Sequence, residues 1–175
     1  PRGLVELEVD HTEAGELSGM YRKNRPLMRS RIRAGYDILK QHALTDPTRI
    51  AAIGYCFGGT TVIELARSGA EVVGVASFHG GLDSPDPEAG KNIKAKVLVL
   101  HGADDTFMSA ENMAAFEQEM KSAGVDYRII QYPGAVHSFT VPEAGNDPSK
   151  GMAYNADADA NSWQELIAFL ADVLQ

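Results

Sequence analysis

The stretch Gly54-Tyr-Cys56-Phe57-Gly58-Gly decides the fold of this 175-residue chain. It follows an apolar run, Arg49–Gly54, that predicts a buried strand, and it precedes a helical pattern that begins near Thr60. A cysteine therefore stands between two glycines, each two residues away, on a predicted strand–turn–helix. This arrangement is typical of a sharp turn that exposes a nucleophile, with cysteine in place of serine. The glycines are expected to let the strand and the helix pack closely around the turn.

The position of Cys56 predicts a reactive thiol. A helix that begins directly after it favours negative charge, so the pKa of the thiol should fall and the thiolate should become more abundant. The backbone N–H of Phe57 is expected to point toward a developing oxyanion, where one donor contributes about 2.7–4 kcal/mol. The alternative is a buried structural thiol, which is common for free cysteines. A phosphate-binding loop is excluded, because the glycine spacing matches neither glycine-rich phosphate motif.

Further apolar runs and helical patterns alternate along the chain. Near-continuous apolar character is typical of strands buried on both faces of a parallel sheet, and alternation with helices predicts an α/β domain, here a single one over residues 1–175. A short strand is also predicted over Leu4–Val9, a helix from Pro26 to about Ala43, and a long loop over Pro133–Asn161. The remaining predicted strands are Val72–Phe78, Lys96–His101 and Tyr127–Tyr132, and the helices are Thr60–Ser68, Ala110–Ala123 and Ser162–Leu174.

Candidates for an acid and a base follow two of these strands. Asp104 and Asp105 come after the strand Lys96–His101, and His137 lies in the loop after Tyr132. The histidine would move protons at the thiol and the leaving group, and either acid could orient it. The chain order nucleophile, acid, histidine is that of the α/β-hydrolases.

The other histidines have simpler interpretations. His79 and His101 end predicted strands and are expected to organise loops by hydrogen bonding, whereas His11 and His42 are expected at the surface. No metal site is expected, because no pair of histidines or cysteines shows the short spacing of metal ligands.

Composition restricts the class of partner. The net charge of −8 argues against nucleic-acid and membrane partners. No apolar run is long enough to span a bilayer and no secretory signal is visible. The single cysteine excludes an intrachain disulfide and favours a cytoplasmic location. A local basic cluster is interpreted as the solvated face of a helix rather than an anion site; it consists of Arg22, Lys23, Arg25, Arg29, Arg31 and Arg33.

Together, four segments resemble the dienelactone hydrolase family, a branch of the α/β-hydrolases with a Cys-His-Asp triad. They are Asp46–Gly59, Phe78–Gly80, His101–Asp105 and Tyr132–Phe139, and the resemblance covers the chain from about Arg25 to its C-terminus. It implies Cys56 as nucleophile, Asp105 rather than Asp104 as acid, and His137 as base. It also implies attack on an ester or lactone carbonyl, an acyl-thioester and its hydrolysis by water, with no cofactor.

The chain departs from the family in two ways. Family members are longer at the front, and that part supplies the first strands of the sheet and a second oxyanion donor. The expected fold is therefore a partial α/β-hydrolase, a mostly parallel sheet flanked by helices with its first strands missing. The family's type enzyme also holds a substrate carboxylate with an arginine four residues past the histidine, where this chain has Val141. Small acyl esters are accordingly favoured over dienelactones.

A sheet without its first strands would leave Arg49–Gly54 as an exposed apolar edge, and such edges seek partners. We therefore expect a homo-oligomer formed through that edge or a fragment of a larger protein. The leading hypothesis is a hydrolase of carboxylic esters. The competing hypothesis is an inactive remnant that serves as a binding or assembly module. A thiol redox protein is a weaker third, because no second cysteine can resolve an oxidised Cys56.

Overall fold

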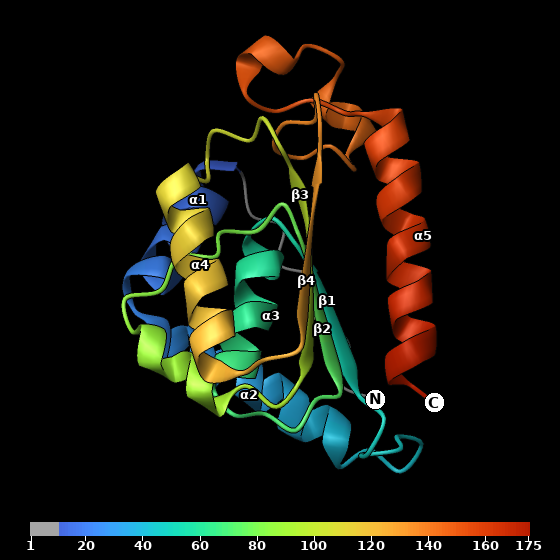
Figure 1. Ribbon diagram of the computed structural model, residues 1–175. Helices are drawn as coiled ribbons and strands as arrows, with labels where there is room; N and C mark the ends of the chain where they lie inside the picture. The colour runs from blue at the N-terminus through green and yellow to red at the C-terminus, as the bar shows by residue number, and fades with distance from the viewer. Residues whose placement is uncertain (1–10) are drawn as a thin grey trace.

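A computed structural model describes residues 11–175 (Figure 1), so the strand predicted over Leu4–Val9 lies outside the described residues. Four parallel strands form one sheet in the order β1-β2-β3-β4. This is an α/β-hydrolase-like fold, as predicted. The strands are β1 (Ala51–Tyr55), β2 (Gly74–Phe78), β3 (Lys96–Gly102) and β4 (Tyr127–Tyr132). The helices are α1 (His11–Lys23), α2 (Arg25–Lys40), α3 (Phe57–Arg67), α4 (Ala110–Ala123) and α5 (Ala156–Val173), with short 3₁₀ turns η1 (Pro87–Asn92), η2 (Pro142–Ala144) and η3 (Pro148–Lys150).

Helices cover both faces of the sheet, with α2, α3 and α4 on one side and α5 on the other (Figure 1). Successive residues of β3 divide between the two cores. Val97 and Val99 pack with α3 and α4, and Leu98 and Leu100 pack with α5. Because side chains alternate along a strand, a strand covered on both faces must be apolar at every position. This explains the continuous apolar runs in the sequence.

Most of the predicted elements are confirmed, and two differ. The helix α1 was not predicted, because Gly15 and Gly19 interrupt a polar segment with little apolar periodicity. The helix α5 begins at Ala156, within the predicted loop and six residues before Ser162. Asn155 caps it by accepting the backbone N–H of Ala158.

The glycines of the turn act differently from the prediction. A Cβ on Gly54 would lie 2.0 Å from the carbonyl oxygen of Gly58, so the strand and the helix touch there backbone to backbone. A Cβ on Gly58 would meet nothing within 4 Å. The second close approach instead involves Gly59, whose Cβ would lie 2.7 Å from Oγ of Ser77 in β2 and 3.0 Å from the Cα of Gly80 just after that strand. Gly54 and Gly59, rather than Gly54 and Gly58, make the turn compact.

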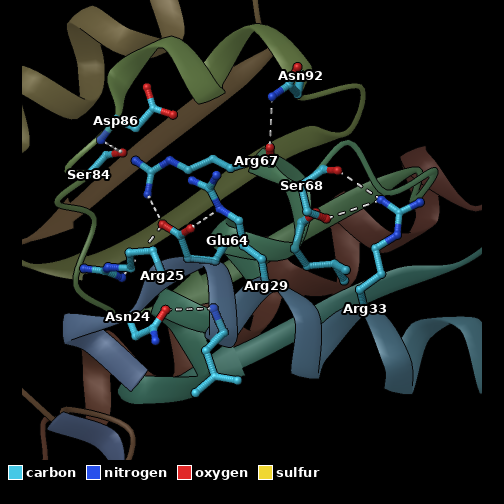
Figure 2. Close-up of polar contacts among 12 residues, drawn as sticks. Asn24, Arg25, Arg29, Arg33, Glu64, Arg67, Ser68, Ser84, Asp86 and Asn92 are labelled. Atoms are coloured by element: carbon cyan, nitrogen blue, oxygen red, sulfur yellow. Dashed lines mark hydrogen bonds and ion pairs between the residues drawn. The ribbon is translucent and has the colours of Figure 1, made fainter. Parts of the chain in front are cut away.

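Part of the basic cluster is buried, which corrects its interpretation as a solvated face. Glu64 of α3 is fully buried and pairs with Arg29 at 2.6 Å and with Arg67 at 2.8 Å (Figure 2). Arg25 is 5% exposed and contacts Asp83 at 2.7 Å. Arg67, also fully buried, binds both carboxylate oxygens of Glu119 from α4. This network ties α2 and α4 to the helix that follows Cys56.

The strand β1 lies at one end of the sheet formed by the described residues. Its Ile53 and Tyr55 side chains are each 41% exposed. The exposed apolar edge is thus present in residues 11–175, and self-association through it remains a prediction. Within the same residues no helix combines the length and the apolarity that crossing a membrane requires.

Candidate active site

Parallel register gathers the candidate residues at one edge of the sheet. Tyr55 pairs with Phe78 and Phe78 pairs with Leu100, so β1 and β2 end level with Leu100 of β3, which continues to Gly102. The next residue in each case is Cys56, His79 or His101. The carboxyl edge of a parallel sheet is where α/β proteins commonly bind ligands.

Cys56 occupies the strained turn between β1 and α3. Its φ of 52° lies in the left-handed region, which non-glycine residues rarely adopt and which often marks a functional position. Its backbone N–H donates to the carbonyl of Phe78 at 3.0 Å, which fixes the turn against β2. As N-cap of α3 its side chain makes no capping hydrogen bond, so the sulfur faces other groups. Phe57 is the first residue of that helix, where a backbone N–H has no partner within the helix.

His137 and Asp105 lie together as predicted. Nδ1 of His137 donates to Oδ2 of Asp105 at 2.9 Å, and Oδ1 of Asp105 accepts the backbone N–H of Phe107 at 2.9 Å. Asp105 is 5% exposed, whereas Asp104 is exposed. The structure therefore distinguishes between the two neighbouring acids, which residue spacing alone left open.

His79 is part of the site, which the sequence prediction missed. It is fully buried, and its Nδ1 lies 3.3 Å from the Cys56 sulfur and 3.2 Å from the Cys56 backbone nitrogen. Its Nε2 lies 3.0 Å from Oγ1 of Thr140. The predicted hydrogen-bonding role is confirmed, but one of the bonded groups is the thiol itself. The signal that could have revealed this is that β1 and β2 end at paired residues, Tyr55 and Phe78, so that Cys56 and His79 follow side by side.

His101 lies behind Asp105, with its Nε2 3.6 Å from Oδ2. Its two ring nitrogens have no hydrogen-bond partner in the described part of the chain, so the predicted loop-organising hydrogen bonds are absent there. Burial lowers the pKa of His101, which keeps this imidazole neutral beside the carboxylate.

The site favours a thiolate beside an imidazolium. Burial raises the pKa of the Cys56 thiol, but interactions with His137 and His79 outweigh it and bring that pKa to about 5. Burial lowers the pKa of His137, but Asp105 and Cys56 raise it to about 9. Burial likewise opposes ionisation of Asp105, and the hydrogen bond and charge of His137 still hold its pKa below the usual value. The sulfur and one ring nitrogen of each of His79 and His137 lie within 4.8 Å of one another.

A pocket of about 290 Å³ opens beside these residues. Its wall combines the three histidines His79, His101 and His137 and the carboxylate of Asp105 with apolar side chains and with two opposite charges. The apolar members are Phe107, Met108 and Met152, and the charges are Arg22 of α1 and Asp83 after β2. The Arg22 guanidinium also lies over the Phe57 ring, 5.5 Å from its centroid.

Comparison with known proteins agrees with this fold. The model of the dienelactone hydrolase family matches residues 7–174. The crystal structure of P91, a dienelactone hydrolase-like promiscuous phosphotriesterase from metagenomic libraries, superposes with a TM-score of 0.88 at 37% identity. The alignment covers 95% of this chain and 70% of P91.

Two relatives differ in how much of their own length this chain covers. The uncharacterized protein K02A2.1 of Caenorhabditis elegans is 31% identical over 83% of this chain and 93% of its own length. A Synechocystis protein provisionally named a carboxymethylenebutenolidase is 29% identical over 69% of this chain and 49% of its own length. The chain thus spans about half of that relative and nearly all of the nematode protein.

Proposed function

Because the chain belongs to the dienelactone hydrolase family, we propose that it hydrolyses carboxylic esters or lactones with Cys56 as the nucleophile. The observation that carries the proposal is the spatial order of three side chains. The thiol and a ring nitrogen of His137 lie within 4.8 Å, and Asp105 binds the other side of that imidazole at 2.9 Å. A nucleophile, a base and an acid in this spatial order form a catalytic triad.

In the first half of the reaction the thiolate attacks the substrate carbonyl carbon. A C–S bond forms, the carbonyl electrons move to oxygen, and the N–H of Phe57 stabilises the oxyanion. When the carbonyl re-forms, the C–O bond to the alcohol breaks, and the departing oxygen takes the proton from His137. An acyl-thioester on Cys56 and a free alcohol remain.

In the second half, water attacks the thioester. His137 accepts the proton of the attacking water, and the collapse of the tetrahedral intermediate releases the acid and the Cys56 thiolate. Asp105 holds the tautomer of His137 and stabilises its cationic form. His79 contacts both the sulfur and the backbone nitrogen of Cys56, so we assign it the positioning of the thiolate.

Two features favour small neutral acyl esters over dienelactones. The pocket has a volume of about 290 Å³. This is small for a ligand-binding pocket, since the usual volumes begin at about 300 Å³. Val141 stands where the family's type enzyme places the arginine that holds a substrate carboxylate. Because a thiolate nucleophile works only while it is reduced, a reducing cytoplasm suits this chemistry.

The test is release of p-nitrophenol from a short-chain nitrophenyl ester by the wild-type chain and by Cys56→Ala, each verified as folded. Turnover that disappears in the variant supports the proposal, and undiminished turnover in the variant refutes it. A matched ester that carries a carboxylate on its acyl chain tests specificity, because we expect the neutral ester to react faster. If both folded proteins are inactive, the binding or assembly module becomes the better account.

Phosphotriesters are a second candidate substrate class. The likeness to P91, whose activity is promiscuous phosphotriester hydrolysis, favours them. The same thiolate would attack phosphorus and displace an aryloxide. Turnover of an aryl phosphotriester that is lost in Cys56→Ala would support this activity, and no release above buffer would exclude it.

A further inference from the structure

Three side chains from separate loops present metal-binding atoms to a common point. They are Cys56 after β1, His79 after β2 and His137 after β4, with the sulfur and one nitrogen of each ring within 4.8 Å of one another. We propose that these residues bind Zn²⁺, and that the bound ion reversibly inhibits the enzyme. The inhibition rests on the proposed function, whereas the binding does not.

The donor set suits zinc. Cysteine sulfur and histidine nitrogen are its preferred ligands, in tetrahedral geometry. The Zn–S bond is about 2.3 Å long and the Zn–N bond about 2.1 Å, so a tetrahedral zinc ion places its sulfur and nitrogen ligands about 3.5 Å apart. The observed separation of Cys56 Sγ and His79 Nδ1 is 3.3 Å. The two ligands are therefore already close to the separation that zinc requires.

Both histidines have the outer partners that metal-binding histidines usually have. Nδ1 of His137 donates to Asp105 at 2.9 Å, so its Nε2 keeps a free lone pair. His79 has the opposite arrangement: Nδ1 accepts the Cys56 N–H, and Nε2 lies 3.0 Å from Thr140 Oγ1. Such partners fix the tautomer and the orientation of a ligating imidazole.

Zinc binding would require His79 to exchange one hydrogen bond for a metal bond. The Cys56 N–H that Nδ1 accepts also donates to the carbonyl of Phe78 at 3.0 Å, so it keeps a partner when Nδ1 turns to a metal. Neither Cys56 nor His79 has to leave its place, because both follow directly on paired strands. Cys56 and His79 are thus already in place, and the ring nitrogen of His137 lies within 4.8 Å of both ligand atoms.

Three protein ligands leave the fourth position of zinc open. His79 and His137 both line the pocket, so a water or a substrate oxygen can complete the coordination from that side. The metal would occupy the sulfur lone pair used for attack and the His137 nitrogen used for proton transfer. Bound zinc and catalysis by Cys56 are therefore mutually exclusive. The sequence spacing gave no sign of this site, because its ligands are 23 and 58 residues apart along the chain.

Titration of the untagged, chelator-treated chain with Co²⁺, followed by Zn²⁺, tests the binding. We expect one Co²⁺ per chain, a near-ultraviolet sulfur-to-cobalt charge-transfer band, and loss of that band when Zn²⁺ displaces the cobalt. Cys56→Ser should abolish the band. His79→Gln should weaken binding by at least about 10-fold, and Thr140→Val by about 10–100-fold. His42→Gln, at an exposed histidine, is the matched control and should bind as the wild type does.

A missing charge-transfer band in the folded wild-type chain would overturn the proposal, and so would unchanged affinity in both His79→Gln and Thr140→Val. Zinc added to the esterase assay should inhibit reversibly and compete with the ester. Binding without any esterase activity would show that the proposed function is wrong and the metal site correct. Esterase activity without metal binding would show that the proposed function is correct and the metal site is wrong.

Discussion

Asp105 and His137 come from different loops, yet Oδ2 of the buried carboxylate lies 2.9 Å from Nδ1 of the imidazole. The neighbouring Asp104 is exposed, and its backbone N–H, not its side chain, bonds to the carbonyl of Ala135. Substitution of each of these adjacent acids is therefore a matched test, in which only the substitution of Asp105 should lower activity.

Asp105→Asn should lower kcat by about 10⁴-fold, because an amide cannot hold the required tautomer of His137 or stabilise its cation. Asp104→Asn should leave kcat unchanged. Steady-state hydrolysis of a nitrophenyl ester by both variants checks this. Equal losses in the two variants would mean that the contact between Asp105 and His137 is not what orients the base.

Reactivity of Cys56 should follow the thiolate–imidazolium pair. The pKa of Cys56 is lowered to about 5 and that of His137 is raised to about 9, so the ion pair exists between these values. Activity should rise as the pH passes 5, and it should fall as the pH passes 9, because His137 then loses the proton that the departing oxygen takes. The two pKa values describe the coupled Cys56–His137 pair rather than either residue alone. The sequence has one cysteine, so iodoacetamide reports on it directly. The alkylation rate, measured with a chelator present, should have its midpoint near pH 5, and a midpoint near the ordinary value of about 8.5 would contradict the account.

The buried network around Glu64 should contribute strongly to stability. Glu64→Gln removes the buried charge that pairs with Arg29 and Arg67; Arg67 keeps its pair with Glu119, whereas Arg29 loses its carboxylate partner. The free energy of unfolding should fall by about 3–5 kcal/mol. Glu117→Gln breaks an exposed pair with Lys121 within α4 and should cost no more than about 0.5 kcal/mol. Urea denaturation of both variants makes the comparison, and similar small losses would show that the network contributes little.

Two glycines beside Cys56 should respond in opposite ways to the same substitution. Gly54→Ala places a methyl group 2.0 Å from the backbone of Gly58 and should cost about 3 kcal/mol or more. Gly58→Ala meets nothing within 4 Å in a helix, so it should be neutral or stabilise by about 0.5–1 kcal/mol. Thermal unfolding of both variants tests this. A lower melting temperature for Gly58→Ala than for Gly54→Ala would mean that the turn packs differently.

Much of this arrangement could be predicted from the sequence because its signals are local. Apolar runs with no polar face gave the parallel strands, and glycine on both sides of Cys56 gave the turn. The order of Cys56, Asp105 and His137 suggested their roles, and the structure brings all three to one edge of the sheet.

The features that sequence reasoning missed depend on partners distant in the chain. In the sequence Arg25 cannot be distinguished from a surface arginine, because its partners Glu64 and Asp83 come from other parts of the chain. His79 lies beside Cys56 only because β1 and β2 end in register, which no local pattern shows. The start of α5 is an exception, because its cap, Asn155, is a local signal in the sequence.

The central claim is that Cys56 carries the acyl group during turnover. Intact-protein mass spectrometry of the chain, quenched in acid during reaction with a slowly deacylating nitrophenyl ester, tests it most directly. We predict a mass increase of one acyl group, located by peptide mapping on Cys56 and removed by hydroxylamine. Steady turnover with no adduct on Cys56, together with retained activity in Cys56→Ala, would contradict the account.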